Sequence, residues 1–128
     1  TRMSFSNYLE TEILDHVFGG AAYTAPSTLY VALYTATPND AGGGTELSGS
    51  GYTRKSAAFT TSGATTSNSG AVEYDTATGN WGTITHIGVF DAATSGNLMA
   101  YGALSASKAV DTGDVFRIPA GDLDITLN

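Results

Sequence analysis

Residues 81–104 read WGTITHIGVFDAATSGNLMAYGAL, and this stretch decides the fold. Two apolar runs flank a polar connection that contains glycine, which predicts a β-hairpin with a loop longer than two residues. The first run is apolar on both faces, because Ile84 and Phe90 point one way while Ile87 and Val89 point the other. A strand of this kind is covered on both sides. We expect a second sheet on one side, and the N-terminal helix or a neighbouring subunit on the other.

The N-terminal stretch 4–18 carries the clearest helical pattern. Apolar residues recur at four-residue spacing, namely Phe5, Leu9, Ile13 and Val17. Asn7 or Ser4 can cap the start, and the two glycines at 19–20 end the helix. The apolar stripe is wide, which leaves two interpretations. The helix packs on its own sheet, or it docks partly onto a neighbouring molecule.

Residues 28–35 predict a strand with two different faces. The face that carries Leu29, Val31 and Leu33 is aliphatic and is expected to point inward. The opposite face carries Tyr30, Ala32 and Tyr34. Outward tyrosines either pack against neighbouring strands or form a contact surface, since they bury area and keep a polar tip.

The remaining segments predict short strands and loops. The long loop 37–51 is either functional or mobile, and 60–70 is either a loop or a weak edge strand. Further strands are expected at 52–59, 71–76, 108–110, 115–118 and 123–127. We therefore expect a single mainly β domain over 1–128, an antiparallel, jelly-roll-like β-sandwich of about seven to eight short strands with one N-terminal helix at 4–18.

Composition excludes several classes of protein. The formal net charge of −7 repels phosphate, which argues against nucleic-acid binding. Charged residues make up 13% of the chain, well below the usual share, as suits β-structure within an assembly. The absence of cysteine excludes disulfides and thiolate metal sites. We expect no membrane-spanning segment and no signal peptide.

Residues with catalytic or metal-binding chemistry are few and unpatterned. His16 lies late in the helical stretch and His86 within the central strand, and neither has the spacing of a zinc site. The sequence contains no Gly-x-Ser-x-Gly elbow for a nucleophilic serine. The pairs Asp111–Asp114 and Asp122–Asp124 offer oxygen ligands for calcium, but aspartates in turns usually bond their own backbone. We predict no catalytic residue, no cofactor and no metal, and thus no enzyme.

Three stretches carry a family resemblance. They are SNYLETEILDHVFGGAAYTAPSTLYVALYTATPNDAGGGTELSGSGYTR at 6–54, the central stretch at 81–104, and AGDLDITLN at 120–128. The chain resembles a family of small virion structural proteins of tailed bacteriophages, often labelled phage tail-fibre proteins and including head-decoration proteins. The resemblance implies a virion component, assembled in the host cytoplasm, with no catalytic residues.

Two roles compete under this resemblance. The first is a capsid decoration (cement) protein that binds the outer shell and stabilises the head, with the major capsid protein as partner. The alternative is a tail-fibre or tail-tip component involved in host attachment, with tail proteins as partners. We place decoration first, because heptads and repeats are missing and the aromatic residues lie mostly in strands. A homo-oligomer, trimer or dimer, is expected. The candidate interface residues are Phe5, Tyr8, Tyr30 and Tyr34, together with the loop 37–51.

Overall fold

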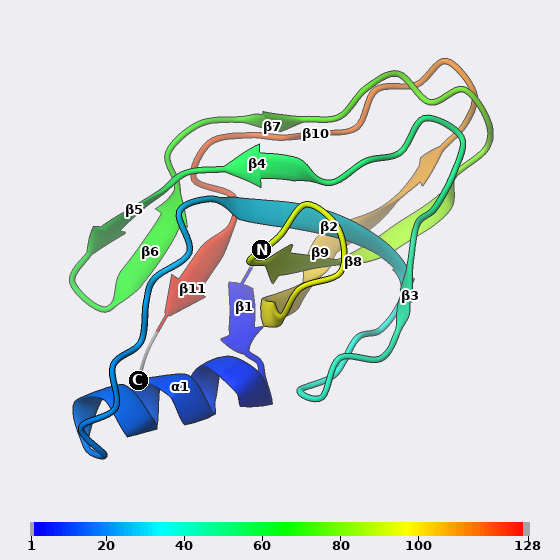
Figure 1. Ribbon diagram of the computed structural model, residues 1–128. Helices are drawn as coiled ribbons and strands as arrows, with labels where there is room; N and C mark the ends of the chain where they lie inside the picture. Colours follow the sequence, from blue (N-terminus) through cyan, green and yellow to red (C-terminus); the bar gives the residue numbers. More distant parts are fainter. Residues whose placement is uncertain (1, 127–128) are drawn as a thin grey trace.

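The hairpin predicted at 81–104 lies at the middle of the computed structural model, which describes residues 2–126 (Figure 1). Strand β8 (Gly82–Phe90) pairs antiparallel with β9 (Leu98–Val110). β9 continues to Val110, so the strand expected at 108–110 is its end. The prediction of a hairpin with a long loop is confirmed.

The large sheet grows outward from this hairpin on both sides. Its order is β3-β2-β8-β9-β1-β11-β6-β5, with β4 also paired to β2, and a separate two-stranded sheet joins β10 and β7. The other strands are β1 (Arg2–Phe5), β2 (Leu29–Ala36), β3 (Thr45–Glu46), β4 (Lys55–Ala57), β5 (Phe59–Ser62), β6 (Thr65–Asn68), β7 (Val72–Glu73), β10 (Arg117–Ile118) and β11 (Asp124–Thr126). The strand pairs are antiparallel except for β1 with β11, which is parallel. Leu127, expected in the last strand, lies outside the described residues.

Two layers enclose the main core. Figure 1 shows β4, β7 and β10 lying over β2, β8 and β9. Fully buried side chains from the lower layer, such as Leu33 and Ile87, meet Val72 and Ile118 from the upper layer and Leu123, which precedes β11. The expected β-sandwich with an N-terminal helix is confirmed. The structure has eleven strands over residues 2–126, more than expected, because several span two to four residues.

The side chain of Ile84 lies on a different face of β8 from the one predicted. Strict alternation predicted that Ile84 shares a face with Phe90. The structure places Ile84 in the main core with Ile87 and Val89, while Phe90 lies on the opposite, outer face. The reason is a register shift between Ile84 and His86, because such irregularities break the alternation of a strand.

Tyr52 completes the hydrogen bonding at the outer edge of β2. β4 covers one part of this edge and β3 covers the other, which leaves the Leu33 N–H between them. That N–H donates to the Tyr52 hydroxyl at 3.0 Å, and the hydroxyl donates to Glu46 Oε2 at 2.7 Å. The Tyr52 ring stacks on Tyr74 with ring centroids 6.2 Å apart. One tyrosine thus joins the edge of the sheet to the core.

Helix α1 (Asn7–Val17) differs from the helix expected at 4–18. Residues Arg2–Phe5 form β1, because their backbone pairs with β9 and β11. The N-cap is Ser6 rather than Asn7 or Ser4. None of the residues in α1 is buried, so the stripe is not fully packed on its own sheet. Docking onto a neighbouring molecule stays a prediction.

The segment 60–70 is an edge hairpin of β5 and β6, which decides between the two interpretations above. Threonine hydroxyls bridge its strands, with Thr61 donating to Thr66 at 3.1 Å. Asn68 is buried, and its amide N–H groups donate to the carbonyl oxygens of Gly70 and Pro119. Polar ladders of this kind hold an edge strand without apolar side chains.

We predict that Tyr52→Phe lowers the free energy of unfolding by about 1–3 kcal/mol, because it removes the acceptor of the Leu33 N–H, which lies between the parts of the β2 edge that β3 and β4 cover. Chemical denaturation measures the change. Tyr30→Phe is the matched control, since the Tyr30 hydroxyl makes no hydrogen bond within residues 2–126. Equal stability of the two variants would refute the role of Tyr52.

Candidate functional site: a pocket beside the start of the helix

A small apolar cluster covers the outer face of the central hairpin. Ala32, Tyr34, Phe90 and Leu98 are buried there, with Tyr101 packed against them. The cluster lies flat on the sheet because β8 has a glycine beneath it. A Cβ at Gly88 would lie 3.0 Å from Tyr34 Cε1 and 3.0 Å from Leu98 Cδ1. The loops that follow lie around this cluster.

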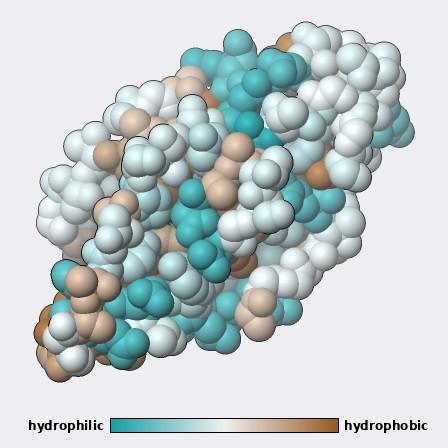
Figure 2. Space-filling view, in the orientation of Figure 1, coloured by the Kyte–Doolittle hydropathy of each residue, from teal (hydrophilic) through white to brown (hydrophobic). Residues whose placement is uncertain are grey.

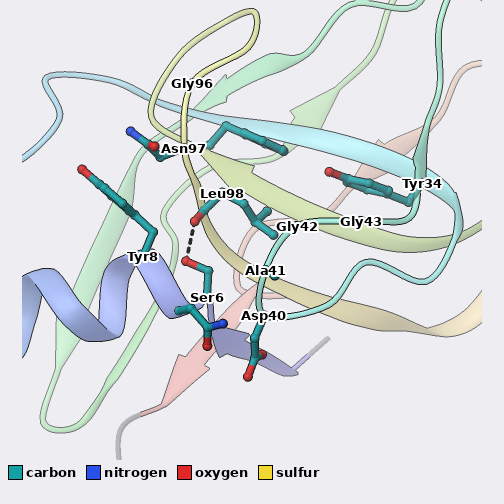
Figure 3. Close-up of a pocket in the computed structure, with 12 residues that line it drawn as sticks. Ser6, Tyr8, Tyr34, Asp40, Ala41, Gly42, Gly43, Gly96, Asn97 and Leu98 are labelled. Atoms are coloured by element: carbon teal, nitrogen blue, oxygen red, sulfur yellow. Dashed lines mark hydrogen bonds between the residues drawn. The ribbon is translucent and has the colours of Figure 1, made fainter.

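A pocket of about 490 Å³ opens above the cluster (Figure 3). Its walls come from the start of α1, from the loop 40–43, and from the end of the loop 91–97. Figure 3 shows Tyr8 and Asn97 at one end of the pocket and Tyr34 at the other, with Leu98 between them. Three segments far apart in the chain therefore build one hollow.

Ser6 anchors the start of α1 at the pocket wall. Its hydroxyl donates to the carbonyl oxygen of Leu98 and accepts the N–H of Leu9 at 3.2 Å. Its own N–H donates to the Met99 carbonyl at 2.8 Å, and the Asn7 N–H donates to the Asp40 carbonyl at 2.9 Å. These bonds satisfy free N–H groups of the helix start. They also hold the helix, β9 and the loop 40–43 together.

The Arg54 side chain holds the loop 91–97 in place. Its guanidinium makes a bidentate ion pair with Glu46, with contacts of 2.8 and 2.9 Å. It also donates to the carbonyl oxygens of Ala92 at 3.0 Å and Ser95 at 2.7 Å. The same group lies 3.7 Å above the centroid of the Phe90 ring, a cation–π contact. A planar donor with five N–H groups suits this site better than lysine would.

The tip of the loop 91–97 is closed by an aspartate and an asparagine. Asp91 accepts the backbone N–H of Asn97 at 2.7 Å on one oxygen and its side-chain N–H at 2.9 Å on the other. Gly96 permits this close turn, since it has a φ of 77° and a Cβ there would lie 2.6 Å from Asp91 Oδ1. The Asn97 side chain is thereby fixed at the rim of the pocket.

Tyr34 is a buried side chain of the pocket whose polar end is not used by the fold. The residue is 4% exposed, and Figure 3 shows its hydroxyl directed toward the end with Asn97. Within residues 2–126 this hydroxyl makes no hydrogen bond, whereas no enclosed side-chain nitrogen or oxygen lacks a partner. It must therefore face open space. Burial raises the pKa of Tyr34 to about 12, so the group stays protonated and can donate.

A second surface lies at the other end of α1. Leu14, Val17 and Phe18 are 57%, 60% and 81% exposed. Figure 2 shows brown atoms at the lower left, over this end of the helix. Between the helix and the β5–β6 hairpin runs an apolar groove of about 330 Å³, lined on the helix side by Phe5 and Leu9. We call these surfaces the helix tip and the apolar groove.

The four candidate interface residues fall in different places. Tyr8 and Tyr34 line opposite ends of the pocket, and Phe5 lines the apolar groove. Tyr30 is half-buried and lines neither. Part of the loop 37–51 forms a pocket wall. Sequence reasoning missed Ser6, Arg54 and Asn97, although the Ser-Gly-Asn turn at 95–97 was a local signal.

The residues considered for catalysis and metals have structural partners. His86 Nδ1 lies 2.8 Å from the Thr85 hydroxyl, and His16 Nδ1 accepts the Tyr23 N–H at 3.2 Å. Asp114 accepts the Asp111 N–H at 2.9 Å. Among residues 2–126, no three histidine, aspartate or glutamate side chains gather as a metal site would require. Over the same range, no helix has the length and apolarity to cross a membrane.

We predict that Ser6→Ala lowers the free energy of unfolding by about 1–2 kcal/mol and frees the start of α1, because it removes both the cap and the bond to Leu98. Hydrogen exchange of the amides at 7–10, with denaturation in parallel, measures both effects. Ser4→Ala is the control, since Ser4 is exposed. Unchanged exchange at the helix start would contradict this role.

Comparison with known proteins places the chain in a family. No curated protein matches it. The family model described as podophage GP4 fiber I protein gp80 matches residues 4–126, which is nearly the whole chain. The resemblance to phage virion structural proteins is thereby confirmed. The chain belongs to the podophage GP4 fiber I protein gp80 family.

Proposed function

We propose that this chain is a structural subunit of a bacteriophage fibre, and that it acts by binding other molecules rather than by catalysis. The family match over residues 4–126 carries the proposal, because the description of that family names a fibre protein. The partners of His86, His16 and Asp114 support a non-catalytic role, since each side chain serves the fold.

The fibre role now precedes the decoration role. The small size, the β-content and the low charge of the chain suit a capsid decoration protein and a fibre subunit equally well. The family description names a fibre protein, and it therefore supports the fibre role. A position on the head remains the alternative role. Localisation of the protein on the virion distinguishes it from the fibre role.

The chain carries two apolar surfaces that suit assembly from identical copies. The helix tip offers Leu14, Val17 and Phe18, and the apolar groove lies nearby. The rim of the groove on the β5–β6 side consists of threonine, glycine and alanine at 61–66, with no carboxylate. A second copy can therefore approach the groove although each copy has a net charge of −7.

The tip of one copy entering the groove of the next makes a head-to-tail contact. Contacts of this kind build rings or open filaments rather than closed pairs. A symmetric contact of helix on helix is disfavoured, because the exposed face of α1 carries Glu10 and Asp15, which would meet the same residues of the partner. Head-to-tail assembly therefore suits a fibre.

Gold-labelled antibody against the chain should mark fibres on purified particles of its phage. The copy number from quantitative mass spectrometry should be that of fibres, far below the hundreds expected for a head protein. Label over the head in hundreds of copies would refute the fibre role and support decoration. A matched antibody against the major capsid protein is the control for head labelling.

We predict that Phe18→Ser weakens self-association of the purified chain at least tenfold, because it removes the most exposed apolar side chain of the helix tip. Sedimentation across a concentration series measures the association. Val115→Ser is the matched control, since Val115 is also exposed, at 45%, but lies outside the helix tip and the groove.

Thermal unfolding of the two variants should match the parent chain, which separates assembly from folding. A parent chain that stays monomeric throughout the concentration series would overturn the head-to-tail contact. The same holds if both variants weaken association equally.

A further inference from the structure

The segment between α1 and β2, residues 19–28, forms one wall of the apolar groove, and we call it the strap. Figure 1 shows it turning back at the end of the helix and running to β2. Tyr23 and Pro26 of the strap line the groove, together with Phe5 and Leu9. The position of the strap therefore sets the shape of the groove.

His16 is the side chain that ties the strap to the helix. The helix ends with Gly20 at a φ of 74°, and the Ala21 N–H donates to the Asp15 carbonyl at 3.0 Å. Beyond this turn, His16 Nδ1 lies 3.2 Å from the Tyr23 nitrogen and 3.1 Å from the Ala21 carbonyl oxygen. Within residues 2–126, no other side chain of α1 makes a hydrogen bond to the strap.

One ring nitrogen cannot serve both neighbours at the same time. A neutral ring with its proton on Nε2 accepts the N–H of Tyr23 at Nδ1. A charged ring has an N–H on both nitrogens, so Nδ1 donates to the Ala21 carbonyl oxygen and can no longer accept from Tyr23. Uptake of one proton from solvent therefore exchanges the hydrogen bond to Tyr23 for one to Ala21.

The groups around His16 leave its ring as the one that changes charge between pH 8 and pH 5.5. Glu12 lies one turn earlier on the helix and Asp15 precedes His16, and carboxylates ordinarily titrate below this range. Residues 7–28 contain no lysine or arginine. Burial is the main cause that raises the pKa of Tyr23 above its ordinary value, so the Tyr23 hydroxyl stays protonated. Histidine is the side chain that ordinarily titrates in this range.

We propose that His16 acts as a pH-dependent latch on the apolar groove. The neutral ring holds the strap at Tyr23, and protonation releases the Tyr23 N–H and loosens the wall that Tyr23 and Pro26 form. The latch belongs to the single chain. Its effect on assembly rests on the proposed fibre function, in which the helix tip of another copy enters the groove.

Amide hydrogen exchange of the full chain tests the latch, followed by NMR at a concentration at which the chain is monomeric. We expect the protection of the Tyr23 amide, corrected for the intrinsic effect of pH on exchange, to fall about threefold between pH 8 and pH 5.5. His16→Gln should not show this fall, because glutamine does not titrate. The Ala21 amide is the internal reference, since it donates to the Asp15 carbonyl and not to the ring.

His86→Gln is the matched control. It removes the other histidine of the chain, which lies in β8 and contacts Thr85 rather than the strap, so the fall at Tyr23 should remain. Thermal unfolding of each variant shows that the fold is retained. The latch is overturned if Tyr23 has the same protection at both pH values or if His16→Gln shows the same fall as the parent chain. Equal loss of protection at Ala21 would also overturn it, since the whole helix end would then unwind.

Sedimentation of the parent chain and of His16→Gln, across a concentration series at both pH values, measures the effect on assembly. At pH 5.5 the parent chain should associate about threefold more weakly than His16→Gln. Equal association of the two at pH 5.5 would overturn the coupling of the latch to assembly. A chain that stays monomeric at both pH values would overturn the head-to-tail contact, whereas the exchange experiment still decides the latch.

Discussion

Burial on both faces of the part of the β8–β9 hairpin next to its loop, residues 87–90 and 98–100, is the constraint on which the rest of the structure depends. The inner face needs a second layer, which β4, β7 and β10 supply with the main core between. The outer face is covered by the flat cluster above Gly88 and by the loops around it. Loops that cover a sheet in this way must be tied down, since their backbone polar groups need partners. Arg54 and Ser6 provide those ties, and the pocket is what remains between them.

Arg54 holds the loop 91–97 with a charged side chain, and the burial of a charge costs free energy that other contacts must offset. Its side chain is 7% exposed, and burial of an ion pair costs free energy that the pair alone does not recover. Two carbonyl oxygens and the Phe90 ring supply the additional contacts. The loop 91–97 is thus held at a defined height above the sheet. A pocket wall built in this way is held in place before any ligand arrives.

The sequence predicted those features that local patterns determine. The central hairpin, the inward set Leu29, Val31 and Leu33, and the presence of one helix follow from periodicity and turn residues. Strands of two or three residues, such as β3 and β10, carry no periodicity and exist through pairing with distant segments. The helix was predicted to start too early. Residues 4 and 5, expected in its first turn, pair with β9 as part of β1 and belong to the sheet. Tyr8 and Tyr34 were chosen as aromatic contact residues, but their meeting at one pocket depends on the loops between them.

The two ends of α1 are held differently. α1 has eleven residues and is therefore about 16 Å long, with the pocket at its start and the helix tip at its end. The start is fixed by Ser6, whereas Leu14, Val17 and Phe18 near the other end are exposed.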